Sequence, residues 1–185
     1  MRKTLFNRGT GLLKYLAIAA TVIAVAGCSG YNKLLKSTDA ELKYRKALEY
    51  FNAGKYPKTI QLLETVMHQF NGTNKDDSVA YYYATAHYKA GDFESSSILF
   101  DQFRQAVTNS AFLEDAEYMY AKAFYYSSPA PNRDQTATRR ALIAIDEYVE
   151  RYPESPAKAS MEENVAELNQ KLHDKAFLNA KLYYD

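Results

Sequence analysis

The sequence predicts an all-α protein: a tandem array of about three and a half helical hairpins forming an α-solenoid, preceded by a cleaved signal peptide. The first observation behind this fold class is a repeat, because Ala47, Ala84 and Ala121 are 37 residues apart and each lies within an amphipathic helical pattern. A constant period of roughly 30 to 45 residues is typical of proteins whose repeats stack on their neighbours. The second is a short apolar stretch near the N-terminus that ends at Cys28, the single cysteine.

The composition is that of an ordinary globular protein of one domain. Of the 185 residues, 47% are hydrophobic and 24% are charged, which indicates neither a disordered chain nor a membrane bundle. Four basic residues and no acid precede Cys28, so 19 of the 23 Lys and Arg residues remain after it, against 22 Asp and Glu. Nucleic acid is therefore not expected as a partner, because phosphate binding needs a basic face.

Residues 1–27 have the features of an export signal peptide: a basic start, an uncharged apolar stretch and small residues. The uncharged stretch from Tyr15 to Ala26 has 12 residues, whereas a membrane-spanning helix needs roughly 20, which argues against the alternative of a permanent transmembrane helix. The residues Val25, Ala26, Gly27 and Cys28 together resemble the lipobox of bacterial lipoproteins. We predict that Cys28 is lipidated with acyl chains such as palmitate, and that residues 28–37 are a lipidated linker.

The residues after Cys28 indicate where the lipoprotein goes. Ser29 occupies the position at which an aspartate retains lipoproteins in the inner membrane of enterobacteria-like systems, so we expect delivery to the outer membrane. Residues 29–36 contain none of the acidic residues that export some Bacteroidetes lipoproteins to the cell surface. By that resemblance, the protein is expected to face the periplasm.

Further features recur with the 37-residue spacing. Gly54 and Gly91 keep it, each followed two residues later by an aromatic residue, and Leu63 and Phe100 keep it too. A small residue, a glycine seven positions later, an aromatic and then an apolar residue resemble the tetratricopeptide repeat. The small residue lets two helices approach closely, and the glycine closes the first helix in the left-handed conformation. We therefore expect a tetratricopeptide-like helical repeat domain over residues 38–185.

Breakers and caps divide this domain into hairpins. The first helix is expected to begin near Thr38, with Glu41 completing a capping box, and its partner to cover residues 57–70. The second hairpin is expected over residues 77–107, and the third from Phe112, with its second helix over residues 136–152 and 11 extra residues before it. The extra residues include two prolines, which predict a projecting loop.

One long helix is expected from Ala157 to Tyr184, as no helix breaker interrupts it. Its last part resembles the first helix of a fourth hairpin. The chain ends before the second helix of that hairpin, so we expect the repeat domain to be truncated at its C-terminus.

No pattern for catalysis, cofactors or metals is present. His68, His87 and His173 lie on different repeats without a partner at helical spacing, so no metal site is expected. Motifs for a nucleophile or a phosphate-binding loop are missing from the sequence, and neither a cofactor nor a small-molecule substrate is expected. The protein is interpreted as a binding protein and not as an enzyme.

An aromatic ladder is the candidate binding feature. Two series of aromatic residues recur every 37 positions, and within each repeat the two members are seven residues apart, on one side of the helix. At these positions tetratricopeptide folds direct side chains into the concave groove, which predicts a peptide-binding surface; packing between repeats is the alternative. The predicted peptide-binding residues are Tyr44, Phe51, Tyr81, Tyr88, Tyr118 and Tyr125.

These residues together resemble the BamD lipoproteins of the β-barrel assembly machinery of the outer membrane, in particular the Bacteroidetes form. The resemblance covers essentially the whole mature chain. Its carriers are the lipobox and residues 31–37, the first hairpin over residues 44–70, the helix with Tyr81, Tyr82 and Tyr83, the loop residues Ser128, Pro129, Pro131, Asp134, Gln135 and Thr136, and then Tyr148, Tyr152, Pro153, Ser155 and residues 179–184.

The resemblance implies an outer-membrane scaffold with two kinds of partner: unfolded outer-membrane proteins, recognised by the N-terminal repeats, and a BamA-like barrel protein, docked by the C-terminal ones. Such proteins hold five repeats, and this chain has about three and a half. Two other functions fit the same pattern. One is a periplasmic tetratricopeptide adaptor lipoprotein of the cell envelope, and the other is the accessory repeat domain of a truncated, larger lipoprotein enzyme.

Overall fold

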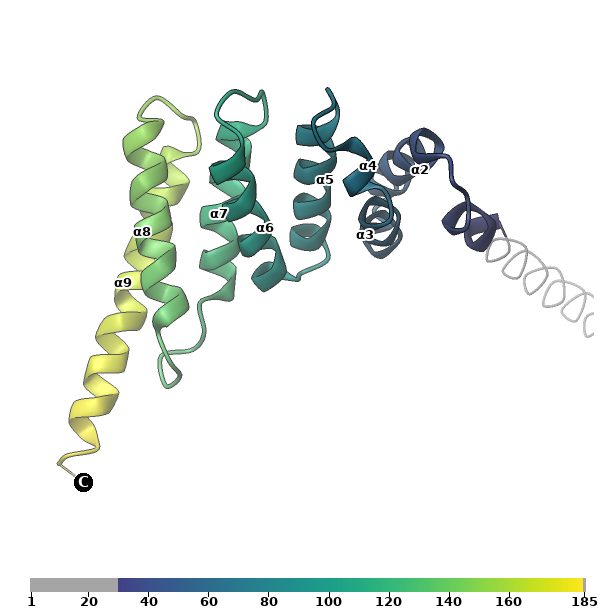
Figure 1. Cartoon of the computed structure of the whole chain (residues 1–185). Helices are drawn as coiled ribbons and strands as arrows, with labels where there is room; N and C mark the ends of the chain where they lie inside the picture. Colours follow the sequence, from purple (N-terminus) through teal and green to yellow (C-terminus); the bar gives the residue numbers. More distant parts are fainter. Residues whose placement is uncertain (1–29, 185) are drawn as a thin grey trace, which may run out of the picture. The chain divides into compact units, whose positions relative to one another are not determined.

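The computed structural model describes residues 30–184, and its regular elements there are all helices (Figure 1). The chain divides into two compact units, Met1–Lys43 and Tyr44–Asp185. In the first unit, residues 30–35 form a short helical segment within the predicted linker. The predicted signal peptide and Cys28 lie outside the described residues. In the described part of the chain, every helix is too short or too polar to cross a membrane.

The first helix of the first hairpin is α2 (Ala40–Asn52). Its N-terminal cap is Asp39, whose Oδ1 accepts a hydrogen bond of 2.8 Å from the backbone N–H of Leu42. The prediction that Thr38 caps this helix with Glu41 is therefore wrong. The helix begins two residues later than the predicted capping residue, at a position where aspartate is among the strongest capping residues.

The second helix of this hairpin is divided into α3 (Tyr56–Glu64) and α4 (Met67–Phe70), whereas the sequence predicted one helix. The hydroxyl of Thr65 donates to the backbone carbonyl of Leu62 at 2.7 Å, and the backbone N–H of Thr65 bonds the same carbonyl. These bonds tighten the last turn of α3, and Val66 then leaves the helical conformation with φ −125°. Threonine competes with the helix in this way because its hydroxyl bonds nearby backbone groups.

The remaining helices confirm the predicted array of three and a half hairpins. Each packs against the next along the chain, from α5 to α9, and α3 and α4 pack against α5. The long last helix is present, and its assignment to the beginning of a fourth hairpin stays a prediction. These helices are α5 (Asp76–Lys89), α6 (Phe93–Ala106), α7 (Leu113–Ser127), α8 (Thr136–Arg151) and α9 (Lys158–Lys181).

The two predicted glycine turns are confirmed. Gly54 has φ +69° and Gly91 has φ +83°, the left-handed conformation that glycine adopts without strain. At the second turn, the N–H of Gly91 bonds the carbonyl of Tyr88, and the N–H of Asp92 bonds that of His87, both at 3.0 Å. This pair of bonds is the Schellman motif, which satisfies the last carbonyl groups of a helix.

The small residues that recur every 37 positions lie where the two helices of a hairpin pack closely, as predicted. Ala47, Ala84 and Ala121 are fully buried. Across the first hairpin, the hydroxyl of Thr59 bonds the carbonyl of Ala47 at 3.2 Å, and Ser96 makes the same bond to Ala84. Thr59 and Ser96 are themselves 37 residues apart, so the periodicity could have revealed them, but our sequence interpretation did not include them.

The proline-containing loop of the third hairpin, residues 128–135, is held by a buried amide. The Nε2 of Gln135 donates to the carbonyl groups of Ala130 at 2.9 Å and Arg133 at 3.2 Å. Its Oε1 accepts a bond of 2.7 Å from the hydroxyl of Thr138 on α8. The loop is therefore a fixed part of the surface, since the amide that organises it is buried with its hydrogen-bonding groups satisfied.

Candidate binding surface

The six predicted ladder aromatics lie on the first helices of three consecutive hairpins. All six side chains are half-buried. The spacing of seven residues puts the two aromatics of each helix on the same side, two turns apart. They are Tyr44 and Phe51 on α2, Tyr81 and Tyr88 on α5, and Tyr118 and Tyr125 on α7.

Two of the tyrosines contact the start of the first helix of the following hairpin. The hydroxyl oxygen of Tyr44 lies 2.9 Å from the Oγ of Ser78 on α5. In the next repeat, the hydroxyl of Tyr81 donates a hydrogen bond to the carboxylate of Asp115 on α7. The Tyr81 ring also stacks on Phe112, with 4.5 Å between the ring centroids. These contacts join consecutive repeats.

The second aromatics of α2 and α5 also reach the following repeat. Phe51 makes an edge contact with Tyr82 on α5, with centroids 5.1 Å apart. Tyr88 contacts Tyr126 on α7, with centroids 6.0 Å apart. Such edge contacts between aromatic rings add to the stabilisation from buried area.

On α7 the ladder contacts both its own hairpin and the next one. The ring of Tyr118 lies 5.9 Å from that of Tyr148 on α8. The hydroxyl of Tyr125 donates a hydrogen bond to the carboxylate of Glu167 on α9. This bond, together with partial burial, raises the pKa of Tyr125 to about 12. The same bond lowers the pKa of Glu167.

A lysine ammonium group lies against the aromatic rings at the end of the ladder. The Nζ of Lys122 is 4.5 Å from the ring centroid of Tyr125 and 5.1 Å from that of Tyr126. Partial burial lowers the pKa of Lys122, and the nearby carboxylate of Glu167 opposes this effect. Aromatic rings can pack against apolar groups of a peptide, and an ammonium group can bind an anionic one.

The ladder is therefore at least partly a packing feature, because each of its members contacts another helix. Half-burial also leaves part of each side chain accessible, so the peptide-binding role stays a prediction. Tyr126 is exposed beside Tyr125 and did not belong to the predicted set. The periodicity could not identify it, because the residue 37 positions earlier is Lys89.

His87 and Asp92 bind each other across the second glycine turn. Among residues 30–184, no three His, Cys, Asp or Glu side chains lie together as a metal site would require. The Nδ1 of His87 lies 2.8 Å from the carboxylate of Asp92, across the glycine turn. Asp92 also accepts a bond from the N–H of Ser95 at the start of α6, and these bonds lower its pKa.

An ion pair between a buried carboxylate and an exposed arginine on two helices was missed by the sequence interpretation. Glu117, on α7, has a side chain that is 4% exposed, and it binds Arg151 on α8. The two residues are 34 positions apart. Sequence patterning could not find this pair, because an acidic residue within a helix is usually solvent-exposed.

The stacked hairpins, positive-φ glycine turns and buried small residues define a helical-repeat protein of the tetratricopeptide type. The family model described as YfiO, outer membrane lipoprotein, matches residues 36–185. The chain belongs to this family.

Two curated relatives carry the name outer membrane protein assembly factor BamD. The protein of Pasteurella multocida (strain Pm70) is 24% identical over 156 residues, which cover 78% of this chain and 59% of the relative. That of Caulobacter vibrioides (strain ATCC 19089 / CIP 103742 / CB 15) is 24% identical over 174 residues, covering 91% of this chain and 57% of the relative. The chain thus spans less than two thirds of the length of these relatives. The resemblance to BamD is confirmed at the level of the family, while the Bacteroidetes form stays a prediction.

Proposed function

We propose that this protein is a lipid-anchored scaffold of the machinery that assembles β-barrel proteins in the outer membrane, and that it catalyses no reaction itself. The observation that carries the proposal is the family match over residues 36–185, together with the two relatives named as assembly factors. Its proposed partners are unfolded barrel proteins and a BamA-like barrel subunit. A helical-repeat fold supports a scaffolding role, because stacked hairpins present an extended surface to partners.

The proposed anchor is Cys28, with the protein on the periplasmic face of the outer membrane. The lipobox-like sequence that ends at this cysteine supports the assignment. Acylation by more than one chain makes membrane attachment stable, so Cys28→Ala is expected to release the protein from the membrane or leave it unprocessed. Intact mass measurement of the membrane-extracted protein tests this, because an unmodified cysteine in the wild type would contradict the anchor.

The proposed contact surface for unfolded barrel proteins is the ladder side of the first helices. Tyrosine supports this role because it offers a large contact area and a hydroxyl group at a low cost in conformational entropy. The exposed ring of Tyr126 and the ammonium group of Lys122 lie at the end of the ladder, beside Tyr125. An extended peptide with aromatic side chains and a carboxylate suits these groups.

Depletion of the protein in its native host tests the scaffold role. The expected result is a loss of folded barrel proteins from the outer membrane, measured by their altered mobility on gels without heating, and a rise of unfolded forms in the periplasm. Expression of the wild-type protein should restore assembly. Unchanged barrel assembly, with a defect confined to another envelope process, would contradict the proposal and favour a general envelope adaptor.

Photo-crosslinking in intact cells tests the contact surface separately. A benzophenone amino acid in place of Tyr126 is expected to crosslink to newly exported barrel proteins. The matched control places the same group at Glu154, which is exposed in the turn between α8 and α9. Equal crosslinking at both positions would argue against the ladder surface while leaving the scaffold role untouched.

A further inference from the structure

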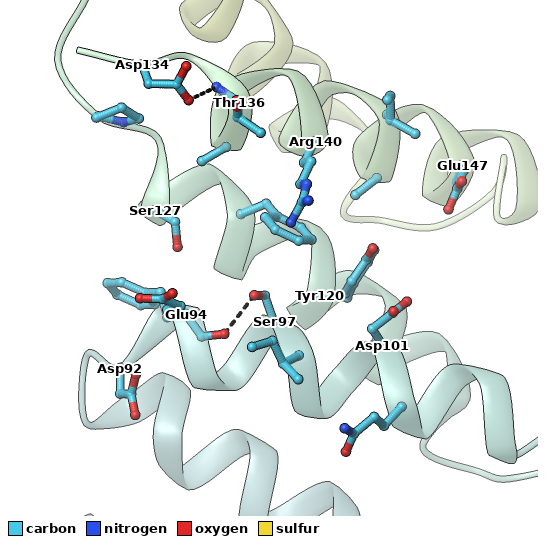
Figure 2. A pocket seen from close by; sticks show the side chains of 18 of the residues that line it. Asp92, Glu94, Ser97, Asp101, Tyr120, Ser127, Asp134, Thr136, Arg140 and Glu147 are labelled. Carbon is cyan, nitrogen blue, oxygen red and sulfur yellow. Dashed lines mark hydrogen bonds between the residues drawn. The ribbon is translucent and has the colours of Figure 1, made fainter.

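A groove lies between the second helices of two consecutive hairpins. Its walls are α6 and α8, and Tyr120 and Ser127 on α7 lie between them (Figure 2). Phe124 on α7 also lines the groove. The groove has a volume of about 1080 Å³. One end is bounded by Asp92 from the glycine turn and by Asp134 from the loop over residues 128–135, so the extra residues of the third hairpin help to shape it.

The groove has the length of a helix of about three turns. On α6 the lining residues extend from Phe93 to Gln105 with consecutive spacings of one or three, and on α8 they extend from Thr136 to Glu147 in the same way. Each wall is thus one continuous side of a helix. At a rise of about 1.5 Å per residue, the walls are roughly 16 to 18 Å long, which matches about three helical turns of a partner segment.

Aliphatic side chains are exposed on both walls. Ile98 on α6 is 55% exposed, and Ile143 on α8 is 60% exposed. In the part of the chain that the structure describes, the other large hydrophobics with such exposure are Tyr126 and residues at the end of α9. Removal of these isoleucines from water would favour binding of an apolar surface.

Acidic side chains outnumber basic ones in the groove. Five carboxylates line it, and Arg140 is the one basic side chain among its lining residues. At one end, Arg104 binds Glu147 at 2.8 Å and lies 3.6 Å from Asp101, so these two carboxylates already have a cation beside them.

At the other end lie the carboxylates of Asp92, Glu94 and Asp134 (Figure 2). Asp92 and Asp134 are held in place, because each accepts a hydrogen bond from a backbone N–H group at the start of the following helix, Ser95 at 3.2 Å and Thr136 at 2.9 Å. Asp92 also lies 2.8 Å from the Nδ1 of His87, and Asp134 lies in the field of Arg139 and Lys175, so Glu94 is the third carboxylate of this end that a partner can meet. A partner with positive charge at this end complements them.

This surface is separate from the aromatic ladder. With 3.6 residues per turn, Tyr120 and Phe124 lie about 100 to 160° around α7 from Tyr118 and Tyr125. A segment in the groove therefore contacts a different side of α7 from the ladder.

We propose that the groove between α6 and α8 is a docking site for an amphipathic helical segment of a partner protein. The segment has aliphatic side chains along the side that faces Ile98 and Ile143, and Lys or Arg residues at the end that faces Asp92, Glu94 and Asp134. This is the helix-in-groove mode of recognition, in which apolar side chains at helical spacing provide affinity and the charges fix the direction.

The test uses the purified full lipoprotein in detergent and two synthetic helical peptides of about three turns. Both carry Leu at positions i, i+4 and i+7; one ends in two Lys residues, and its twin has Glu in their place. Binding is measured by fluorescence anisotropy and by the methyl resonances of isoleucine in the labelled protein. We expect the Lys peptide to bind at least about tenfold more tightly than its twin, and to shift the resonances of Ile98 and Ile143.

Variants identify the site. Ile98→Glu with Ile143→Glu is expected to weaken the Lys peptide by at least about tenfold, because both residues are exposed and their change leaves the helices intact. Leu182→Glu, at a position that is 79% exposed and lies outside the groove, is the matched control and should have no effect. Glu94→Lys is expected to reduce the preference for the Lys peptide, because it changes the formal charge of this end from three carboxylates to two carboxylates and one ammonium group. Circular dichroism verifies that each variant is folded.

Several outcomes would overturn the proposal. One is the absence of methyl shifts at Ile98 and Ile143 with the Lys peptide, and another is equal affinity for both peptides that Glu94→Lys leaves unchanged. Equally tight binding of a proline-containing twin that cannot form a helix would overturn the helical occupant. Self-association that is abolished by Ile98→Glu would identify a second copy of the chain as the occupant, and would overturn the assignment to a different partner.

Discussion

The hydroxyl oxygen of Tyr44 on α2 lies 2.9 Å from the Oγ of Ser78 on α5, which is 34 residues further along the chain. The same separation joins Tyr81 to Asp115 in the next repeat. In these two repeats, the first tyrosine of the ladder thus binds the start of the first helix of the following hairpin. Because these bonds cross between hairpins, the ladder contributes to the stability of the array as well as to its surface.

Tyr81→Ala is expected to lower the free energy of unfolding by about 2 kcal/mol, because the ring stacks on Phe112 and is half-buried. Tyr81→Phe keeps the ring and removes the bond to Asp115, so we expect a loss below about 1 kcal/mol. Urea denaturation followed by circular dichroism measures both. Tyr184→Ala, at an exposed position, is the control. Equal stability of all three variants would contradict a packing role for Tyr81.

Gly91→Val is expected to lower the free energy of unfolding by about 1 to 2 kcal/mol, because φ +83° is strained for a residue with a β-carbon. A Cβ atom at this position would meet no other atom within 4 Å, so the effect comes from the backbone alone. Gly91→Asn should cost less, since asparagine tolerates the left-handed conformation. Thermal melting compares the two, and a larger loss for asparagine than for valine would contradict the explanation.

Arg151→Ala is expected to destabilise the protein by about 1 to 2 kcal/mol, because it leaves the buried carboxylate of Glu117 without its partner. The value is moderate because Arg151 is itself 54% exposed. Adding Glu117→Gln should recover part of the loss, since a neutral amide is less costly to bury than a charge. Chemical denaturation of the two single variants and the double variant provides the coupling energy. Additive effects would show that the two side chains do not interact.

The bond between Tyr125 and Glu167 predicts two pH dependences. The pKa of Tyr125 is raised to about 12 from 10.0, so its contribution to stability is present below pH 10 and is lost as the pH rises through about 12. The pKa of Glu167 is lowered from 4.5, so its contribution is present above that pH and is lost as the pH falls through the lowered value.

Titration of ¹³C-labelled tyrosine by NMR tests this pair. Glu167→Gln should lower the pKa of Tyr125 towards 10, because it removes the carboxylate that accepts the bond and repels the phenolate. An unchanged Tyr125 titration in this variant would exclude the bond as the cause. Tyr125→Phe should also remove the corresponding shift of Glu167.

The extent to which the sequence predicted the fold can be seen at the hairpin turns. Gly54 and Gly91 were identified because a left-handed turn has a local requirement that glycine meets wherever the turn recurs. The division between α3 and α4 was not predicted, because it depends on the bond that Thr65 makes to Leu62 and not on a breaker residue. The cap of α2 was misplaced for a similar reason: Ser, Thr and Asp stood side by side at residues 37–39, and each can cap a helix.

For the binding surfaces, the sequence determined which residues recur and the tertiary structure decided what they contact. The 37-residue period determined the repeat type, the order of the hairpins and the position of the aromatic ladder. Only the tertiary structure decided that Tyr81 stacks on Phe112, that Glu117 binds Arg151, and that Ile98 and Ile143 line one groove. The physical reason is range: helix periodicity and turn conformation depend on neighbours within about four residues, whereas these pairs are 31 to 45 positions apart in the sequence. Their members come to one surface or into contact only when the hairpins stack.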